Sequence, residues 1–162
     1  EAGILKGMYL FRESKETKKP RVQLMGSGSI FREVIAAAEL LEIDWGVVSD
    51  IWSCTSFTEL RRDGMAAERQ ALLNPQEAQK PSYVEQIRPY INDRKFVTLG
   101  TDGFGRSDTR KQLRKFFEVN RYYVVIASLK ALADEGQIQM SVVSDAIKKY
   151  GIDTTKPAPW TV

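Results

Sequence analysis

Short apolar stretches alternate along this chain with longer stretches in which apolar residues recur every three or four positions. The short stretches predict strands over residues 7–11, 21–25, 45–52 and 95–99. The longer stretches predict helices over residues 29–41, 66–73, 85–91, 110–117, 121–135 and 141–150. The order of the two kinds predicts an α/β fold, a three-layer sandwich with a mostly parallel sheet.

The connections add detail to this prediction. The lysine-rich stretch over residues 13–20 is expected to be the turn of a hairpin-like entry to the sheet. Two successive helices near the C-terminus would give one face of the sheet extra cover. The chain has 162 residues, enough for one α/β domain with a sizeable core, so we expect residues 1–162 to form a single domain.

Charge and composition narrow the classes of partner. The chain has 24 Lys and Arg against 21 Asp and Glu, a net charge of +3, and the two signs are interspersed. A nucleic-acid-binding domain usually gathers its basic residues on one face, so we expect no nucleic-acid partner. No apolar run approaches the roughly 18 residues of a membrane span, so we expect no membrane partner either. No signal-peptide pattern is evident, and the lack of an initiator methionine suggests a processed product or a piece of something longer.

The scarcity of reactive side chains excludes several kinds of chemistry. The chain has no histidine and a single cysteine, Cys54. A Cys–His nucleophile within the chain and an ordinary zinc site are therefore excluded. We expect Cys54 to be a buried structural thiol, and the lack of any internal disulfide fits a reducing compartment.

Residues 26–29, Gly-Ser-Gly-Ser, precede a predicted helix and resemble an anion-binding loop. The dinucleotide fingerprint is not met, because Phe31 stands where its third glycine belongs, and no Walker A motif follows. We interpret the stretch as a turn and helix cap. A small nucleotide-binding protein is the alternative, and it would require a nucleotide affinity that falls when Gly28 is made bulky.

A glycine-rich run at residues 100–108, Gly-Thr-Asp-Gly-Phe-Gly-Arg-Ser-Asp, lies between a predicted strand and a predicted helix. Ser107 and Asp108 are expected to cap that helix. Asp102 and Asp108 flank Arg106, an arrangement that predicts either an internal ion pair or a ligand site. A second charged stretch, which we expect to be a structural or interfacial loop, contains Glu59, Arg61, Arg62 and Asp63.

These stretches together resemble a known family. Besides residues 99–110, the matching stretches are residues 3–7, 22–30, 53–60, 62–64, 117–119, 123–127 and 143–147. Through them the chain resembles the C-terminal domain of the homodimeric, thiamine-diphosphate-dependent pyruvate dehydrogenases of bacteria, in the transketolase superfamily. The resemblance covers nearly the whole chain, and the glycine-rich run is specific to this branch of the superfamily.

The resemblance implies a cytoplasmic, homodimeric oxidoreductase that acts after glycolysis. The full enzyme would decarboxylate pyruvate with thiamine diphosphate and magnesium, and would acetylate the lipoyl groups of a dihydrolipoyl acetyltransferase core. In relatives, the first domain carries the diphosphate-and-magnesium motif, Gly-Asp-Gly followed by Asn-Asn, and neither part occurs here. The activating glutamate belongs to the middle domain. We therefore expect this domain alone to be inactive, to bind neither cofactor nor metal, and to support dimerisation.

No catalytic residue can be transferred to this chain from the resemblance. One loop remains as a candidate for contact with another domain or subunit, because it is rich in glycine and has residue types favoured at interfaces. Its residues are Thr101, Asp102, Gly103, Phe104, Gly105, Arg106, Ser107 and Asp108.

One departure from the family's pattern stands out. In relatives a further stretch, including an apolar strand, separates the counterparts of Val84 and Glu85, which are adjacent here. The chain is therefore predicted to lack one family strand after Val84, and two explanations are open. Either the domain has lost the strand, which would leave unpaired backbone groups and a slot in the core, or this sequence is shorter than the chain that is made. The alternative to a domain of the enzyme is a non-enzymatic interaction module derived from the same fold.

Overall fold

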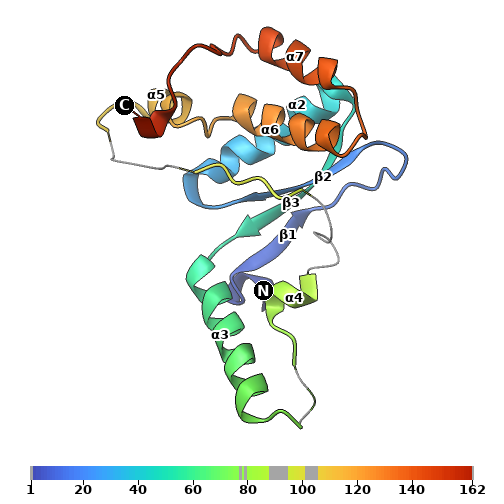
Figure 1. The fold of residues 1–162 in the computed structure, drawn as a ribbon, viewed down its shortest axis with the longest axis vertical. Helices are drawn as coiled ribbons and strands as arrows, with labels where there is room; N and C mark the ends of the chain where they lie inside the picture. Colours follow the sequence, from blue (N-terminus) through green and yellow to red (C-terminus); the bar gives the residue numbers. More distant parts are fainter. Residues whose placement is uncertain (1, 77, 79, 88–94, 101–105, 162) are drawn as a thin grey trace.

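A three-stranded sheet forms the centre of the protein (Figure 1). The structure is a computed structural model that describes residues 2–76, 78, 80–87, 95–100 and 106–161. The strands β1 (Met8–Arg12), β2 (Arg21–Gly26) and β3 (Val48–Cys54) lie in the order β1-β3-β2. β2 is parallel to β3, whereas β1 is antiparallel to it. The described sheet is therefore mixed, and the expectation of a mostly parallel sheet is corrected.

The connection between β1 and β2 is not a hairpin, because β3 lies between the two strands. The polar residues after β1 pass over the start of β3 and are held there by Asp50, which is 4% exposed. The Asp50 carboxylate accepts a hydrogen bond from the Ser14 backbone N–H at 2.9 Å and two from the Arg21 guanidinium at 3.0 Å. A buried carboxylate satisfied in this way keeps the long connection in place.

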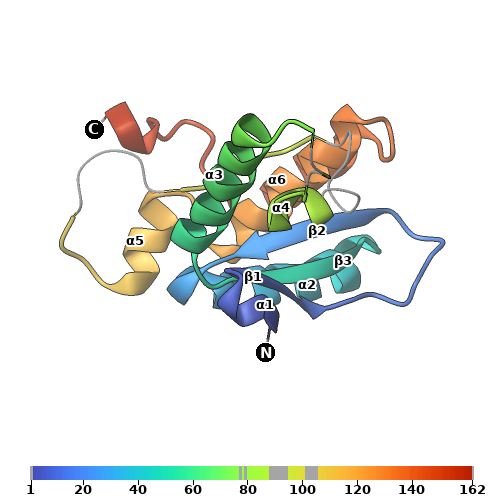
Figure 2. The ribbon, with the colours of Figure 1, turned by 90° about the horizontal axis from the view of Figure 1, so that it is seen from below.

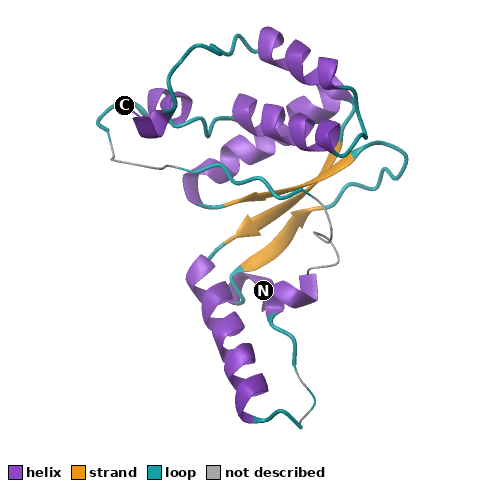
Figure 3. Ribbon diagram, viewed as in Figure 1, coloured by secondary structure: helices purple, strands orange, loops and turns teal. Residues whose placement is uncertain are grey.

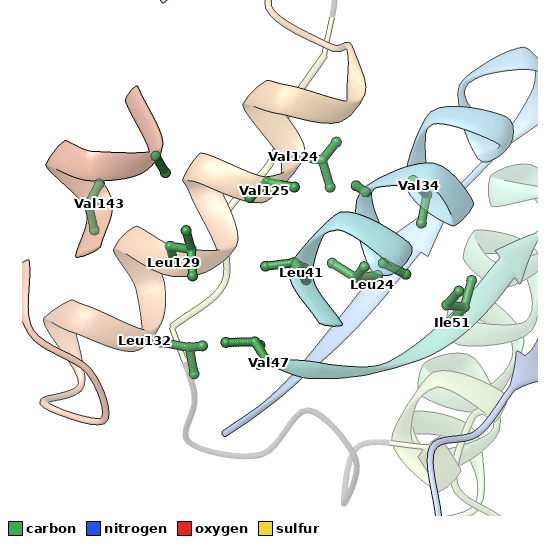
Figure 4. Close-up of a cluster of buried hydrophobic side chains, with 13 residues drawn as sticks. Leu24, Val34, Leu41, Val47, Ile51, Val124, Val125, Leu129, Leu132 and Val143 are labelled. Carbon is green, nitrogen blue, oxygen red and sulfur yellow. The ribbon is translucent and has the colours of Figure 1, made fainter. Parts of the chain in front are cut away.

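The main core lies between the sheet and three helices: α2 (Phe31–Trp45), α6 (Arg121–Asp134) and α7 (Met140–Lys149). α2 packs on β2 and β3, α6 packs on α2, and α7 packs on α6. Leu41, Ile51, Leu129 and Val125 are fully buried there (Figure 4). The three- and four-residue spacing of apolar residues in these helices produces this arrangement, as the sequence predicts.

A smaller apolar cluster covers the opposite face of the sheet. It joins Met8, Trp52 and Cys54 of the sheet to Leu60 of α3 (Phe57–Leu73), with Tyr83 of α4 (Tyr83–Ile87) packed against it. Seen from below, α3 and α4 lie in front of the sheet (Figure 2). The short helix α1 (Ala2–Leu5) leads into β1 from the N-terminal side.

Several predicted boundaries shift. α2 is preceded by a 3-10 turn, η1 (Gly28–Ile30), and continues to Trp45, a residue predicted to begin the third strand. α3 begins at Phe57 rather than at residue 66, because the Ser56 hydroxyl accepts a hydrogen bond from the Glu59 N–H and caps the helix. The predicted helix at residues 85–91 begins at Tyr83, and its described part ends at Ile87.

The predicted strand at residues 95–99 is wrong, since residues 95–100 have no regular secondary structure. The helices of the C-terminal half are confirmed: α5 (Arg110–Phe116), α6 and α7 lie within one or two residues of their predicted bounds. A last 3-10 turn, η3 (Pro159–Thr161), ends the described chain.

Candidate functional site: the α5 surface and the edge of β2

The candidate interface loop is described in part. Residues 101–105, Thr101, Asp102, Gly103, Phe104 and Gly105, lie outside the described residues. Arg106, Ser107 and Asp108 are described, and all three are exposed. The proposed ion pair between Asp102 and Arg106 therefore remains a prediction.

The cap of α5 differs from the expected one. Thr109, rather than Ser107 or Asp108, is the N-cap residue, and its side chain accepts a hydrogen bond from the Gln112 N–H at 3.4 Å. Asp108 supports this cap, because its carboxylate accepts a hydrogen bond from the Thr109 N–H at 2.6 Å. A carboxylate close to a helix N-terminus is also favoured by the helix dipole.

Two cations flank one aromatic ring at the end of α5. The Arg106 guanidinium lies 4.2 Å from the centre of the Phe116 ring, and the Lys156 ammonium lies 5.0 Å from it. Lys156 also donates a hydrogen bond to the Phe116 carbonyl at 2.6 Å, which satisfies a carbonyl at the C-terminal end of the helix. The described part of the loop is thus held against α5 by Arg106, while the exposed edge of that side chain is available for contact.

A buried carboxylate joins α5 and α6 to α2. Glu33, whose side chain is 7% exposed, accepts hydrogen bonds from Arg114 at 2.9 Å and from the Arg121 side chain at 3.0 Å. The Arg121 backbone N–H adds a third bond at 3.0 Å. Burial raises the pKa of Glu33, but the bonds and charge of Arg121 with the charge of Arg114 outweigh it, so the pKa is lowered. The carboxylate is therefore ionised at neutral pH and fixes the position of α5.

The loop at residues 26–29 forms a turn, because Gly28, at φ 53°, begins the 3-10 turn η1. The predicted side-chain cap is wrong, since Ser27 makes no cap bond and Ile30 is the N-cap residue of α2. The Ser29 carbonyl accepts a hydrogen bond from Arg114 at 3.0 Å. Glu33, in the first turn of α2, is paired with Arg114 and Arg121, so its charge is balanced there. The nucleotide-binding alternative stays a prediction.

The charged stretch around residues 59–63 lies on α3 and is not a loop. Arg62 and Glu59 form an ion pair at 2.7 Å along the helix surface. Asp63 accepts a hydrogen bond from the Tyr83 backbone N–H at 2.5 Å, which links α3 to α4. The prediction of a loop is wrong, and the contact of Asp63 gives the stretch a structural role within the chain, while an interfacial role stays a prediction.

Cys54 is buried, as predicted. Its thiol lies 3.3 Å from the Met8 sulfur. Burial raises the pKa of this thiol, so the reactive thiolate form is disfavoured at neutral pH. The side chain acts as a small apolar residue of the core.

A cavity of about 320 Å³ lies along the edge of β2, and no motif in the sequence indicates it. Its lining is mostly apolar and comes from β2, α2, α6, residues 95–99 and the start of α3. We call this space the β2-edge cavity. In the sequence, the apolar residues at 96, 97 and 99 could have indicated this cavity, but the same residues are equally compatible with a buried strand. Their exposure is visible only in the structure.

Within the described ranges, no group of three or more His, Cys, Asp or Glu side chains is arranged to hold a metal ion. The helices of the described residues are also too short or too polar to cross a membrane.

Comparison with known proteins gives consistent matches. The sequence pattern of the transketolase-like TK C-terminal domain matches residues 7–120. The chain is 54% identical to the pyruvate dehydrogenase E1 component of Cupriavidus necator, 50% to that of Pseudomonas aeruginosa and 46% to that of Escherichia coli K12. These matches cover 98–100% of the chain but only 20–21% of each relative. The chain thus spans about a fifth of the length of these relatives, and matches their C-terminal domain.

The lengths of the matches also differ from that of the chain. The match to the Cupriavidus necator protein extends over 185 residues, whereas the chain has 162, a difference of 23. At least that many aligned positions therefore have no counterpart in this chain.

Proposed function

The chain belongs to the transketolase-like C-terminal domain family, and on that premise we propose that it is the C-terminal domain of a pyruvate dehydrogenase E1 component. The observation that carries the proposal is the match of the whole chain, at 54% identity, to a protein of that name. Residues 1–162 form one domain of this enzyme. Its role is to support dimerisation and to shape the approach to an active site built by other domains.

The complete enzyme decarboxylates pyruvate oxidatively and acetylates the lipoyl groups of the acetyltransferase core. Thiamine diphosphate supplies the chemistry of decarboxylation when it is bound, and magnesium holds its diphosphate. Both are bound outside this chain, because the chain lacks the sequence motifs of the family that hold them. The enzyme works in the cytoplasm as a homodimer.

The exposed Arg106–Asp108 end of the glycine-rich loop takes part in a domain or subunit contact. Arg106 is suited to this role, because its guanidinium already lies over the Phe116 ring, 4.2 Å from its centre, and loses little freedom on binding. Arg106→Ala in the intact enzyme should weaken dimer association at least tenfold, as measured by analytical ultracentrifugation. Lys111→Ala, on an exposed position of α5, is the matched control. Equal dimer affinity in the two variants would reject this role.

The shortfall of aligned positions lies between Val84 and Glu85, and it removes a strand of the family's three-layer sandwich. Two features support this placement. β2 is an edge strand of the described sheet, and a cavity lies along that edge. The lost strand would have occupied the β2-edge cavity.

The test of the proposed function is a pyruvate decarboxylation assay on the intact protein, together with its mass. A mass several times 18.4 kDa with thiamine-dependent activity supports the proposal. A mass near 18.4 kDa, with no partner chain that carries the cofactor domains and no activity, rejects it in favour of a non-enzymatic interaction module. In that case isothermal calorimetry should show no saturable heat with thiamine diphosphate.

A further inference from the structure

Residues 95–99, which we call the 95–99 segment, carry apolar side chains that water reaches although a cavity lies beside them. Phe96 is 67% exposed, Val97 45% and Leu99 43%. The same residues line the β2-edge cavity, and they are drawn as a loop that passes the sheet (Figure 3). Exposed apolar groups next to an apolar cavity favour a closer packing of the two, because that packing would remove both from water.

The edge of β2 offers a place for this packing. Among the described residues, β2 bonds to β3 on one side, and its other edge faces the cavity. An open edge presents a row of backbone N–H and C=O groups that another strand can pair with. The cavity touches Leu24 and Val34 of the main core, Met25 beside the smaller cluster and Phe57 at the start of α3. It is therefore bordered by residues from both sides of the sheet, where a further strand of the sheet would lie.

We propose that the 95–99 segment, which forms no strand in the structure described above, rearranges in solution and docks on the open edge of β2 as a fourth strand. Its residues suit a strand, because Phe96, Val97 and Thr98 are aromatic or β-branched. Docking would fill the strand position left open at the edge of β2 with a segment that the chain already contains. It would also cover the edge, which is otherwise a template for pairing with other proteins.

The contacts of Lys95 set the direction of this strand. Its backbone N–H donates a hydrogen bond to the Glu135 carboxylate at 2.8 Å, and its ammonium pairs with Asp134, so the segment begins at the C-terminal end of α6. Leu132 at this end of α6 lies beside Val47, which directly precedes β3 (Figure 4). The start of β3 pairs with the start of β2. The segment therefore begins near the start of β2 and runs parallel to it.

Hydrogen–deuterium exchange on the intact protein, read by mass spectrometry of peptides that cover β2, tests this docking. Because β3 already pairs with one side of β2, the docked strand should slow the remaining β2 amides at least tenfold relative to unpaired chain. If all of these amides exchange at the rate of an unpaired chain, the proposal is overturned. The wild-type protein is sufficient for this test, and no variant is needed.

Two neighbouring proline variants provide a matched pair. Successive residues of a strand direct their N–H groups to opposite sides, so one of Val97 and Thr98 faces β2 and the other faces solvent. Proline is tolerated in an edge strand only where the N–H faces solvent. One of Val97→Pro and Thr98→Pro should therefore speed exchange in β2 about tenfold, whereas the other stays within about twofold of wild type. Peptides from α6 report in both variants whether the rest of the fold is intact.

Three other outcomes would contradict docking of the 95–99 segment. If both prolines change β2 exchange equally, the segment is not paired with β2. If protection of β2 rises with protein concentration, a second copy supplies the strand. If protection appears only when an extended peptide with the sequence of residues 95–100 is added, the edge accepts strands from outside rather than from its own chain.

Discussion

Replacing Glu33 by glutamine removes a buried charge shared by two arginines and keeps the size of the side chain. The Glu33 side chain is 7% exposed, whereas those of Arg114 and Arg121 are 20% and 43% exposed. Removing one partner of a fully buried ion pair costs about 3–5 kcal/mol, and an exposed pair contributes about 0–1 kcal/mol. Because water reaches both arginines, we expect Glu33→Gln to lower the free energy of unfolding by an intermediate amount, about 2–3 kcal/mol.

The pH dependence of this loss identifies the charge as its cause. The pKa of Glu33 is lower in the folded protein than its usual value, because the arginines outweigh the effect of burial. A lowered native pKa stabilises the folded state above the pKa of the unfolded chain, about 4.3, and this contribution is lost as the pH falls through the native pKa. The difference between wild type and Glu33→Gln should therefore be complete at neutral pH and shrink below about pH 4.

Urea unfolding followed by tryptophan fluorescence measures both quantities, since the chain has three tryptophans. Glu42→Gln, at an exposed position of the same helix, is the control and should change the free energy of unfolding by less than about 0.5 kcal/mol. Equal stability of the two variants at neutral pH would refute the reasoning. A loss in Glu33→Gln that stays constant from neutral to acidic pH would refute the electrostatic part of it.

Three further predictions concern packing, backbone and titration. Leu129→Ala, at a fully buried position, should lower the free energy of unfolding by about 2–5 kcal/mol in the same urea experiment. In thermal unfolding, Gly26→Ala should destabilise by about 1–3 kcal/mol because its new Cβ would lie 2.8 Å from the core, whereas Gly64→Ala, with open space in helix α3, should stabilise by about 0.5–1 kcal/mol. Burial, together with a hydrogen bond to Asp44, raises the pKa of Tyr150 to about 12, so an ultraviolet titration should lose one late-ionising phenol in Tyr150→Phe. The stability that comes from the neutral phenol is present below about pH 10 and falls as the pH rises towards 12.

The helices of the C-terminal half were predictable because they depend on local signals. In α6, apolar residues recur with helical spacing, and Asn120 caps the first turn by accepting hydrogen bonds from two backbone N–H groups at 3.0 and 3.2 Å. Gly136, at φ 72°, ends the region in the left-handed conformation that glycine adopts without strain. Periodicity, cap and terminating glycine all lie within one stretch of sequence, so no distant contact was needed to find the helix.

The sheet was less predictable because strand pairing is decided by distant residues. The turn-like residues after β1 suggested a hairpin, but Asp50 in β3 draws that connection over the sheet by bonding Ser14 and Arg21. The apolar run at residues 95–99 has the composition of a strand, yet a strand also requires a partner edge and a connection of suitable length. Neither requirement can be read from the run itself.

The candidate site was also predictable only where local sequence determines it. The resemblance of residues 99–110 to one family could be read from the sequence, and the comparisons confirm that family. The contacts that hold the described end of the loop could not, because Arg106 stacks on a ring ten residues later and Lys156 reaches it from the C-terminal tail. Glu33 was missed because a glutamate on a helix usually faces solvent, and its burial follows from arginines more than 80 residues away.

The proposed shortening near Val84 is compatible with folding because of where the main core lies. Among the described residues, the buried residues of that core come from two parts of the chain, residues 24–51 and residues 124–146. The stretch around residue 84 contributes instead to the smaller cluster, through Tyr83. The proposed loss of a strand there would open an edge and a cavity, while both parts of the chain that build the main core are present. The free-energy cost of unpacked apolar surface therefore falls mainly on the β2-edge cavity. The 95–99 segment, which already lines this cavity, is in position to lower that cost by packing into it.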